Sequence, residues 1–224
     1  MALQLSEVIS EHEFTSIAHV LYAAFHEPFN PFYELLNNTQ GTYEEQIQAK
    51  AARHAEAWKD DPARHWLKIT DSSNNNEVIA AASWLIYEEA PESSKAPIDA
   101  QWQPEGSIIR EFTSRWLGAI VGSQQHALQK PHLVIDQLAT HPSHRNSGAA
   151  NMLLQWGLEQ ADRLGLEIMV NAVPAGLTYY QHFGFVDKGV VDPDMTIEEP
   201  SDEWKRLQKI DKHLYWMTRP PTCS

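Results

Sequence analysis

The feature that most constrains this chain is an apolar segment followed by a proline turn and a run of small residues. Leu133–Ala139 is rich in β-branched and other apolar side chains, which predicts a buried strand. After Pro142, the run Arg145–Ala150 holds one cation, two short polar residues and three residues with little or no side chain. At a helix start, such residues leave main-chain N–H groups open to an anion. The segment therefore predicts an anion site that a diphosphate would fit.

Two other phosphate-binding motifs do not fit this segment. A P-loop needs Gly, four residues and then Gly-Lys-Ser or Gly-Lys-Thr, and a dinucleotide fingerprint needs three spaced glycines. Here Gly148 stands alone. The alternative to an anion site is ordinary packing, in which Gly148 and the neighbouring alanines bring a helix close to a sheet.

The segment resembles the acyl-CoA loop of the GNAT superfamily of N-acyltransferases. The family pattern is an apolar strand, Pro and then Arg/Gln-x-x-Gly-x-Gly/Ala, and the chain has Leu138–Pro142 followed by Arg145–Ala150. A second family element, Tyr-x-x-x-Gly-Phe, is matched by Tyr180–Phe185. The two motifs in this order and spacing are more specific than either alone. The string WGLEQADRLGL after the loop most resembles the fungal small-molecule branch of the superfamily.

The resemblance implies the GNAT fold, an α/β (α+β mixed) architecture. Its central sheet is mixed, mostly antiparallel and twisted, it is splayed at the acyl-CoA site, and helices cover both faces. Strands that alternate with helices along the chain also favour a mixed, partly parallel sheet. We expect residues 1–224 to form one GNAT-type acetyltransferase domain with an insertion at about 88–130, in which Ser107–Gln129 has helical spacing.

Hydrophobic periodicity predicts the remaining elements. Ser10 followed by Glu13 resembles a capping box, which predicts a helix from there to about Phe25. Thr42–Lys59 is a second helical stretch, and a third runs from Gly148 to a cap at Gly165. The predicted strands are Leu3–Val8, His65–Thr70, Val78–Tyr87, Glu167–Val173, Phe185–Val191 and Lys212–Thr218, with a short helix at Ala175–Phe183.

The resemblance also implies how acetyl-CoA binds as the cosubstrate. Main-chain groups of the splayed strand would pair with the pantetheine arm and polarise the acyl carbonyl, and the loop would hold the diphosphate. The strand residues are Leu138, Ala139 and Thr140, and the loop residues are Arg145, Asn146, Ser147, Gly148, Ala149 and Ala150. Val173 departs from the family, which often has Asn or Ser there to help hold CoA.

Tyr180 lies where the family has the acid that protonates the departing CoA thiolate. A phenol has a pKa of about 10, so it is protonated at neutral pH and can act as an acid. Its neighbour Tyr179 is interpreted as a packing residue.

The general base is less well specified. Asp136 lies on the same strand, just before Leu138, and a carboxylate whose pKa is raised by burial could accept the ammonium proton directly or through water. An equally good interpretation is that Asp136 holds the turn or pairs with a cation. Gln137 would face the other side of the sheet unless a bulge intervenes. The rival bases are His132, Glu89 and Glu111.

Composition limits the partners. The formal net charge is −13, from 30 acidic and 17 basic residues, which argues against nucleic-acid binding. Residues 1–62 hold 10 acidic and three basic side chains. We therefore expect a cationic or amine-bearing small molecule between the N-terminal helices and the 88–130 insertion, with Asp136 beneath it. A solvated acidic face is the alternative.

Other features exclude further classes. No apolar run approaches the roughly 18 residues that cross a bilayer, and the lone Cys223 cannot form an internal disulfide. We expect a cytoplasmic protein that is a monomer or homodimer and binds no membrane. The 11 His residues form no HExxH or Cys/His cluster, so we expect no metal site.

These observations predict an acyl-CoA-dependent N-acetyltransferase that moves an acetyl group from acetyl-CoA to a small amine by direct transfer. A peptide or protein acetyltransferase, or a GNAT-fold protein recruited to another biosynthetic step, is the enzymatic alternative. A CoA-binding sensor is the non-enzymatic one. Retention of Tyr180 favours an enzyme, and the insertion favours an enclosed pocket for a small molecule.

Overall fold

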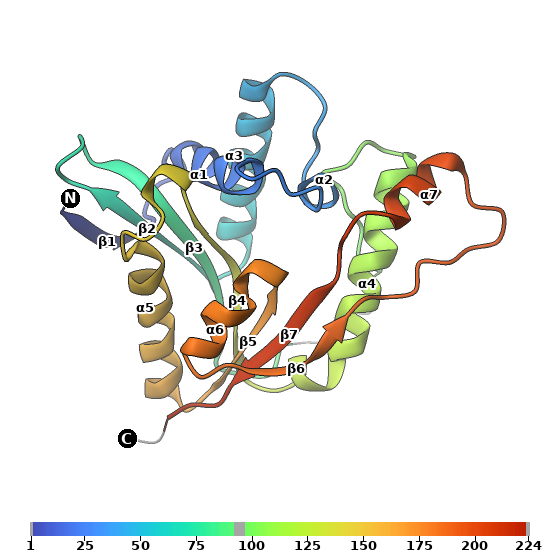
Figure 1. Ribbon diagram of the computed structural model, residues 1–224. Coiled ribbons are helices and arrows are strands. Elements are labelled where there is room, and N and C mark those ends of the chain that lie inside the picture. Colours follow the sequence, from blue (N-terminus) through green and yellow to red (C-terminus); the bar gives the residue numbers. More distant parts are fainter. Residues whose placement is uncertain (1, 92–96, 223–224) are drawn as a thin grey trace.

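The computed structural model describes residues 2–91 and 97–222, which contain seven strands and seven α-helices (Figure 1). The strands are β1 (Leu3–Glu7), β2 (Arg64–Asp71), β3 (Glu77–Tyr87), β4 (His132–Thr140), β5 (Glu167–Ala172), β6 (Val186–Val191) and β7 (Leu214–Arg219). The helices are α1 (Glu13–His26), α2 (Tyr33–Leu36), α3 (Tyr43–Asp60), α4 (Ile108–Leu128), α5 (Ala149–Leu164), α6 (Leu177–His182) and α7 (Asp202–Gln208). Short 3₁₀ turns occupy Pro142–His144 and Pro174–Gly176.

All seven strands join one sheet in the order β1-β2-β3-β4-β5-β7-β6. The β4–β5 pair is parallel, and every other neighbouring pair is antiparallel. The mixed, mostly antiparallel sheet expected from the sequence is therefore confirmed. The parallel pair lies at the centre, where α5 forms the crossover.

Alternating residues of β3 show which helices cover which face. Ala80 and Ala82 pack in the cluster that contains α5, whereas Ala81 between them packs with α1 and α3. Since successive side chains of a strand point to opposite faces, α5 covers one face, and α1 and α3 cover the other. Helices on both faces are thus confirmed.

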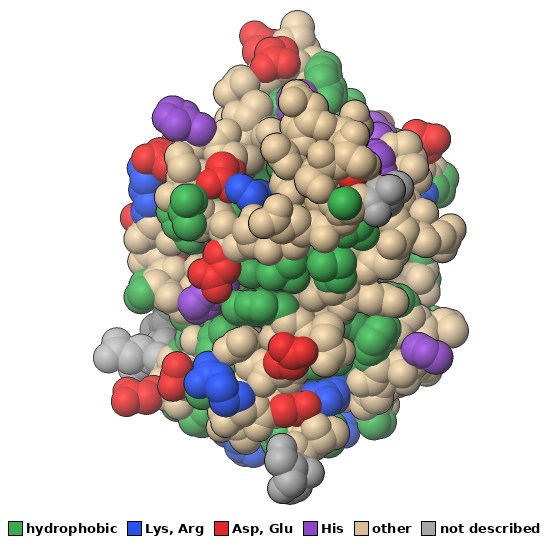
Figure 2. All heavy atoms as spheres, turned by 90° about the vertical axis from the view of Figure 1, so that its left-hand side faces the viewer, with side chains coloured by type: hydrophobic (Ala, Val, Ile, Leu, Met, Phe, Trp, Pro, Cys, Tyr) green, Lys and Arg blue, Asp and Glu red, His purple; other side chains and the backbone are tan. Residues whose placement is uncertain are grey.

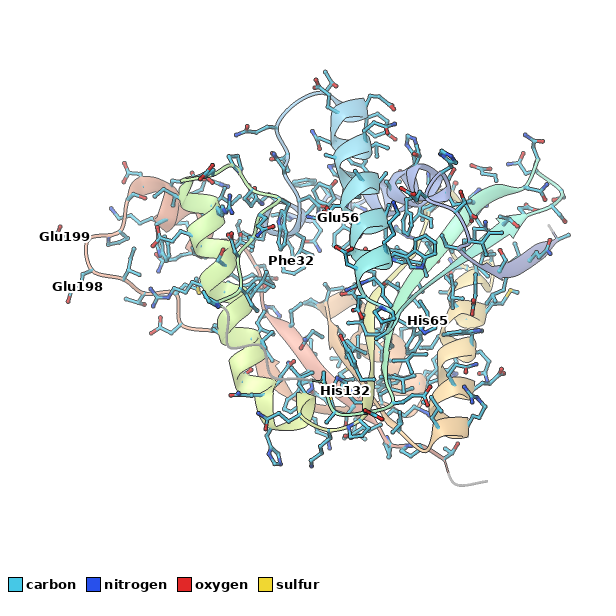
Figure 3. All side chains as sticks on the ribbon, turned by 180° about the vertical axis from the view of Figure 1, so that it is seen from behind. Phe32, Glu56, His65, His132, Glu198 and Glu199 are labelled. Atoms are coloured by element: carbon cyan, nitrogen blue, oxygen red, sulfur yellow. The ribbon has the colours of Figure 1, made fainter. Side chains whose placement is uncertain are left out.

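The α4 helix covers the far half of the α3 face. In β7, Leu214 packs in the cluster formed with α4 and α7, while Met217 packs in the α5 cluster. Figure 1 shows α4 beside β6 and β7, and the view from behind shows α3 and α4 both on the viewer's side of the sheet (Figure 3). Phe32 lies between these two helices, with its ring 5.2 Å from that of Trp116 in α4.

Two helix starts differ in how they are capped. At α3, the Thr42 side chain accepts a hydrogen bond from the Glu45 N–H, and the Glu45 carboxylate accepts one from the Thr42 N–H. The predicted capping box at Ser10 is wrong, because α1 begins at Glu13 with no side-chain cap. The Glu13 carboxylate instead forms an ion pair with Lys68 and accepts from the Ile9 N–H.

The helices can be compared with the length and hydropathy that a membrane span needs. Within 2–91 and 97–222, no helix combines the length and the hydropathy that a bilayer span requires.

Candidate active site

The sheet opens between its two central strands. Strands β4 and β5 pair only as far as Ile135 and Val170, whereas β5 stays paired with β7 on its other side up to Ala172. On its β5 side, the stretch from Asp136 to Thr140 consequently has no strand partner among the described residues. Main-chain donors and acceptors of Leu138–Thr140 are therefore available there to a ligand.

A β-bulge lies at the start of this opening. On the β3 side, Ile135 pairs with Trp84 and Gln137 pairs with Ser83, so Asp136 is the extra residue. The β-bulge that the sequence analysis raised as an alternative for Gln137 is therefore present. It changes which face the following side chains meet, because two residues of β4 oppose one residue of β3.

The predicted anion loop leads directly into α5. Gly148 caps the helix in the left-handed conformation, with φ 88° and no side-chain hydrogen bond to the helix start. A Cβ at Gly148 would meet no atom within 4 Å, so the backbone is open to close approach. Asn146 also has a positive φ of 61°, and Arg145 is exposed, with its guanidinium donating to the Ala24 carbonyl at 3.3 Å.

These features fit an anion held on backbone N–H groups. A 16-residue helix has a partial positive charge at its first turn, and nothing bulky covers Gly148. Only the short turn at 141–144 separates the open strand edge Leu138–Thr140 from the loop Arg145–Ala150. A ligand that carries both a diphosphate and an extended polar arm would match this pair.

Tyr180 is buried near the end of β5. Its side chain is 7% exposed, and its ring centre lies 5.3 Å from that of Phe185. A Cβ added at Gly176 would be 3.2 Å from the Tyr180 ring and 3.8 Å from Ala172. Burial, with a smaller effect of the adjacent Tyr179, raises the pKa of Tyr180, so the phenol is protonated at neutral pH.

Tyr179 has a different environment. Its hydroxyl donates to Asn151 Oδ1 of α5 at 3.2 Å, and burial raises its pKa to about 12. Its ring also lies 5.2 Å from that of Phe183. These contacts tie α6 to α5.

Asp136 pairs with a cation. Arg64 Nη1 donates to Asp136 Oδ2 at 2.5 Å and to Ser83 Oγ at 3.0 Å. The side chains of Arg64 and Asp136 are 16% and 33% exposed, so the pair is shielded only in part. The carboxylate is held at the bulge in one orientation on the face covered by α3.

The rival bases lie in dissimilar places. Glu89 and Glu111 are exposed. His132 is buried at the first residue of β4, with Nδ1 2.5 Å from the Lys130 carbonyl and Nε2 without a hydrogen-bond partner among the described residues. Figure 3 shows His132 at the far end of the strands from α2.

Sequence reasoning missed a group of basic side chains on α3. Lys50 is 7% exposed, and its Nζ lies 4.8 Å from the centre of the Tyr33 ring. Burial, with a smaller contribution from Arg53, lowers the pKa of Lys50 to about 7. His54 is 6% exposed. The signal was present in the spacing, because Lys50 and His54 share the helix face of Ile47, Ala51 and Ala55.

Arg53 is held by the chain before α3. Its guanidinium donates to the Leu36 carbonyl at 3.0 Å and to Asn37 Oδ1 at 3.3 Å, and it lies 4.8 Å from the Trp102 ring. Burial lowers the pKa of Arg53 to about 10, while Tyr33 and Asp136 act in the opposite direction. Arg53 therefore stays charged at neutral pH.

The segment 97–107 clamps α2. The buried Gln103 amide donates to the carbonyls of Glu34, Leu35 and Asn37 at 2.7, 3.3 and 3.0 Å. Trp102 Nε1 donates to the Leu35 carbonyl at 3.0 Å. Part of the predicted insertion thus forms one wall beside the N-terminal helices.

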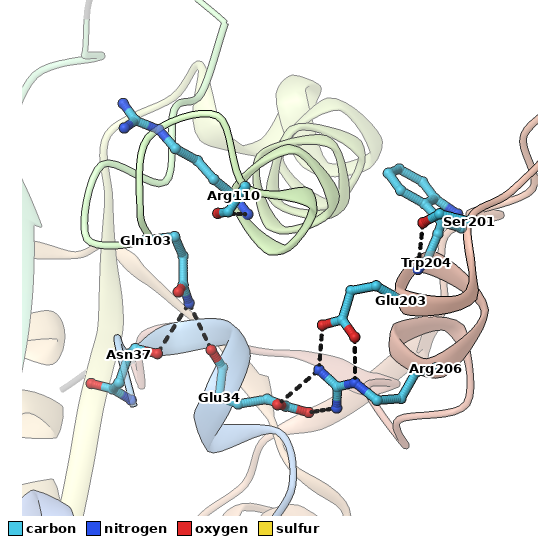
Figure 4. A network of polar contacts seen from close by, with 9 residues as sticks. Glu34, Asn37, Gln103, Arg110, Ser201, Glu203, Trp204 and Arg206 are labelled. Atoms are coloured by element: carbon cyan, nitrogen blue, oxygen red, sulfur yellow. Dashed lines mark hydrogen bonds and ion pairs between the residues drawn. The ribbon is translucent and has the colours of Figure 1, made fainter. Parts of the chain in front are cut away.

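An ion-pair network joins the α1–α3 connection to the β6–β7 connection (Figure 4). Arg206 of α7 donates to Glu34 at 2.8 and 3.2 Å and to Glu203 at 2.9 and 2.8 Å. Glu198 and Glu199 lie farther out, on the loop before α7 (Figure 3). The two connections are therefore held against each other on the side of the sheet that α3 and α4 cover.

The acidic side chains of residues 1–62 are largely engaged in local structure. Glu11 pairs with Lys59, Glu34 pairs with Arg206, and Glu45 caps α3. On the face shown in Figure 2, acidic side chains occur in several separate places among basic and apolar ones. The cation Lys50 is buried instead, and Arg53 is partly buried. The acidic excess therefore gives little support to a purely cationic acceptor.

Comparison with known proteins agrees with this geometry. Residues 77–185 match the model of the acetyltransferase (GNAT) family. The match spans the β3–β4 pair, the opening, the α5 start and Tyr180. No curated protein sequence is a significant match to the chain.

Solved structures share the fold at low sequence identity. Arylalkylamine N-acetyltransferase 2 from Aedes aegypti has a TM-score of 0.66 at 12% identity, covering 99% of this chain and 100% of that chain. Mosquito arylalkylamine N-acetyltransferase like 5b has a TM-score of 0.63 at 12% identity, covering 98% and 100%. The Corynebacterium glutamicum structure described as histone acetyltransferase HPA2 and related acetyltransferase has 0.58 at 18%, covering 100% and 99%.

Residues 77–185 therefore carry a GNAT acetyltransferase domain, which supports an acyltransferase enzyme. The solved acetyltransferase structures share the fold of the whole chain. The resemblance found in the sequence is thereby confirmed for family and fold. The fungal branch stays a prediction.

Proposed function

We propose that the protein is an acetyl-CoA-dependent N-acetyltransferase that acts on a small amine by direct transfer. The observation that carries the proposal is the opening of the sheet after Ile135 and Val170, together with the start of α5 at Gly148, where no side chain caps the helix. The fold shared with structures named for arylalkylamine acetylation supports a small amine. We further propose one cytoplasmic domain over residues 1–224, with the insertion at about 88–130.

The residues of the opening fit acetyl-CoA, which supplies the acetyl group as a reactive thioester. Main-chain groups of Leu138, Ala139 and Thr140 would hold the pantetheine arm and polarise the thioester carbonyl. The backbone from Arg145 to Ala150 would hold the diphosphate, with the Arg145 cation beside it.

Tyr180 serves as the acid in this proposal. When the amine nitrogen forms its bond to the acetyl carbon, the carbon–sulfur bond breaks and the sulfur leaves as a thiolate. The Tyr180 phenol is protonated at neutral pH and can supply the proton that converts this thiolate to a thiol.

Asp136 serves as the base. The acceptor nitrogen loses one proton to become nucleophilic and another after the bond forms. A carboxylate fixed by Arg64 at the bulge can accept a proton directly or through water. Buried His132 on the same strand is the second candidate.

Exchanging Tyr180 tests the chemistry. Tyr180→Phe removes the donor but keeps the ring, and it should lower turnover by roughly 10²-fold or more at unchanged acetyl-CoA affinity. Thiol release from acetyl-CoA in the presence of amines measures the rate, and calorimetry measures binding. Tyr179→Phe is the matched control and should retain turnover. Equal rates for the wild type and Tyr180→Phe, with chemistry rate-limiting, would reassign the acid.

Exchanging Gly148 tests the anion site. Gly148→Glu places an anion where the diphosphate is proposed to lie and should abolish acetyl-CoA binding. Gly165→Glu is the control, because Gly165 ends the same helix with a similar φ of 69° and equally open space. Tight acetyl-CoA binding by a folded Gly148→Glu variant would contradict the assignment.

A further inference from the structure

Four basic side chains gather where α3 packs against β2. Lys50, Arg53 and His54 come from α3, and Arg64 is the first residue of β2. We call them the α3–β2 basic cluster. Burial lowers the pKa of His54, and the positive charges of Arg53, Lys50 and Arg64 lower it further, so His54 is neutral at pH 7.

Three nitrogen atoms of this cluster lack hydrogen-bond partners within the described part of the chain. Arg64 Nε and His54 Nε2 are buried and unsatisfied. For Lys50 Nζ, the described residues offer only a cation–π contact with the face of the Tyr33 ring. Buried donors in folded proteins are almost always paired, and an unpaired buried ammonium is rarer still.

The carboxylates nearby do not reach every member of the cluster. Asp136 is bound to Arg64 at 2.5 Å, and the carboxylate of Asp61, at the end of α3, accepts from the Ala63 N–H at 3.0 Å. Arg53 donates to the Leu36 carbonyl at the end of α2 and lies over the Trp102 ring, so it contributes positive charge to the cluster rather than a free donor. Lys50 is left with no anion.

We propose that the α3–β2 basic cluster binds a carboxylate of the acceptor, so that the substrate is an amino acid or a similar amine that also bears a carboxylate. This inference rests on the proposed acetyl transfer and specifies its substrate class. A carboxylate accepts from both an ammonium and a guanidinium N–H, which matches the free donors of Lys50 and Arg64.

Arg64 sets the direction of such a substrate. One side of its guanidinium holds Asp136 at the bulge of β4, and its Nε remains free. A carboxylate bound at Nε and Lys50 would place the rest of a small acceptor next to Asp136 and the opened strand. The amine would then lie beside the proposed base, with the rings of Tyr33 and Trp102 near the cluster.

Matched acceptors test the proposal with the full-length protein. The common amino acids are compared with their decarboxylated amines, for example L-phenylalanine with 2-phenylethylamine, using acetyl-CoA and thiol release. We expect at least one amino acid to have a kcat/KM about tenfold or more above that of its amine. Lys50→Met should remove this preference by lowering kcat/KM for the amino acid while that for the amine stays unchanged.

Lys59→Met is the control, because Lys59 lies on the same helix but is half exposed and paired with Glu11. It should leave both acceptors unaffected. Thermal unfolding establishes that both variants are folded. Calorimetry without acetyl-CoA measures binding of the same amino acid and should detect it in the wild type but not in Lys50→Met.

The outcomes separate the two proposals. Decarboxylated amines used as well as or better than every amino acid, or an equal loss for both in Lys50→Met, would overturn the carboxylate site and leave acetyl transfer standing. If no amine is acetylated but an amino acid binds the wild type and not Lys50→Met, the carboxylate site is supported and acetyl transfer is wrong. Absence of both binding and preference would overturn the carboxylate site.

Discussion

The two faces of the sheet bury charge in opposite ways. On the α5 face, Arg219 of β7 donates twice to Asp162 of α5, at 2.9 and 3.1 Å, and Thr222 adds two more donors to the same carboxylate. On the α3 face, Lys50 is buried with no anion among the described residues, and Arg64 Nε is unsatisfied. A fully paired charge supports the fold, whereas an unpaired one lowers stability and indicates a ligand.

Packing follows the same division, and the largest effect should come from the α5 face. A Cβ at Gly157 would lie 2.1 Å from the buried Trp84 ring. Gly157→Ala should therefore lower the free energy of unfolding by about 3 kcal/mol or more, because the ring cannot move in a packed core. Denaturant unfolding measures this. Gly118→Ala, in open space on α4, is the control, and equal stability of the two variants would contradict the tight packing.

Exchanging Lys50 should change the free energy of unfolding in the opposite direction. Lys50→Met keeps the length of the side chain but removes the buried charge, so it should raise the free energy of unfolding at pH 6 by about 2 kcal/mol. The Lys50 pKa is about 7 in the folded protein and about 10.4 when unfolded, so the unfolded chain binds more protons between these values. Wild-type stability thus rises with pH across this window.

The gain from Lys50→Met should consequently shrink as the pH rises from 6 to 10. Chemical unfolding of both proteins at several pH values measures this. A pH-independent difference would show that Lys50 is not buried as a charge. Together with the acceptor assay, the result distinguishes a residue kept for binding from one kept for stability.

Asp162 should behave as a structural charge. The hydrogen bonds from Arg219, and then those from Thr222, lower the pKa of Asp162. Asp162→Asn should cost roughly 1 to 2 kcal/mol at pH 7, in the range of hydrogen bonds to charged groups. Since the folded pKa is the lower one, this stabilisation is present above the unfolded pKa of about 3.9 and is lost as the pH falls below it.

Acid unfolding curves of wild type and Asp162→Asn should converge at low pH. Acetyl transfer by the variant should be unchanged at neutral pH, in contrast to Lys50→Met. A difference in stability that persists at low pH would mean that packing, rather than charge, connects α5 to β7.

The sequence predicted the α5 face more fully than the α3 face. The strand, turn and helix from Leu133 to Gly165 follow from local signals, since Pro, Gly and the apolar period act within a few residues. The Arg64–Asp136 pair joins residues that are 72 positions apart and depends on a bulge, which no local pattern specifies. The burial of Lys50 also contradicts the usual exposure of lysine. The seven-residue α7 was not predicted, because so short a helix has little periodicity.

The smallest effects should come from the acidic surface, and they test the first expectation about the acceptor. Glu11 and Lys59 are 55% and 50% exposed, so their pair should contribute less than about 1 kcal/mol. If long-range attraction by residues 1–62 mattered, the KM of a decarboxylated amine would rise with salt. The screening length falls from about 30 Å at 0.01 M to about 3 Å at 1 M. We expect less than a twofold change for 2-phenylethylamine across this range, with Glu11→Gln behaving like the wild type. For an amino acid, the attraction between its carboxylate and the buried cluster should also be weakly screened by salt. A KM that rises with salt for the amine, but not for the amino acid, would show that the acidic surface attracts the acceptor.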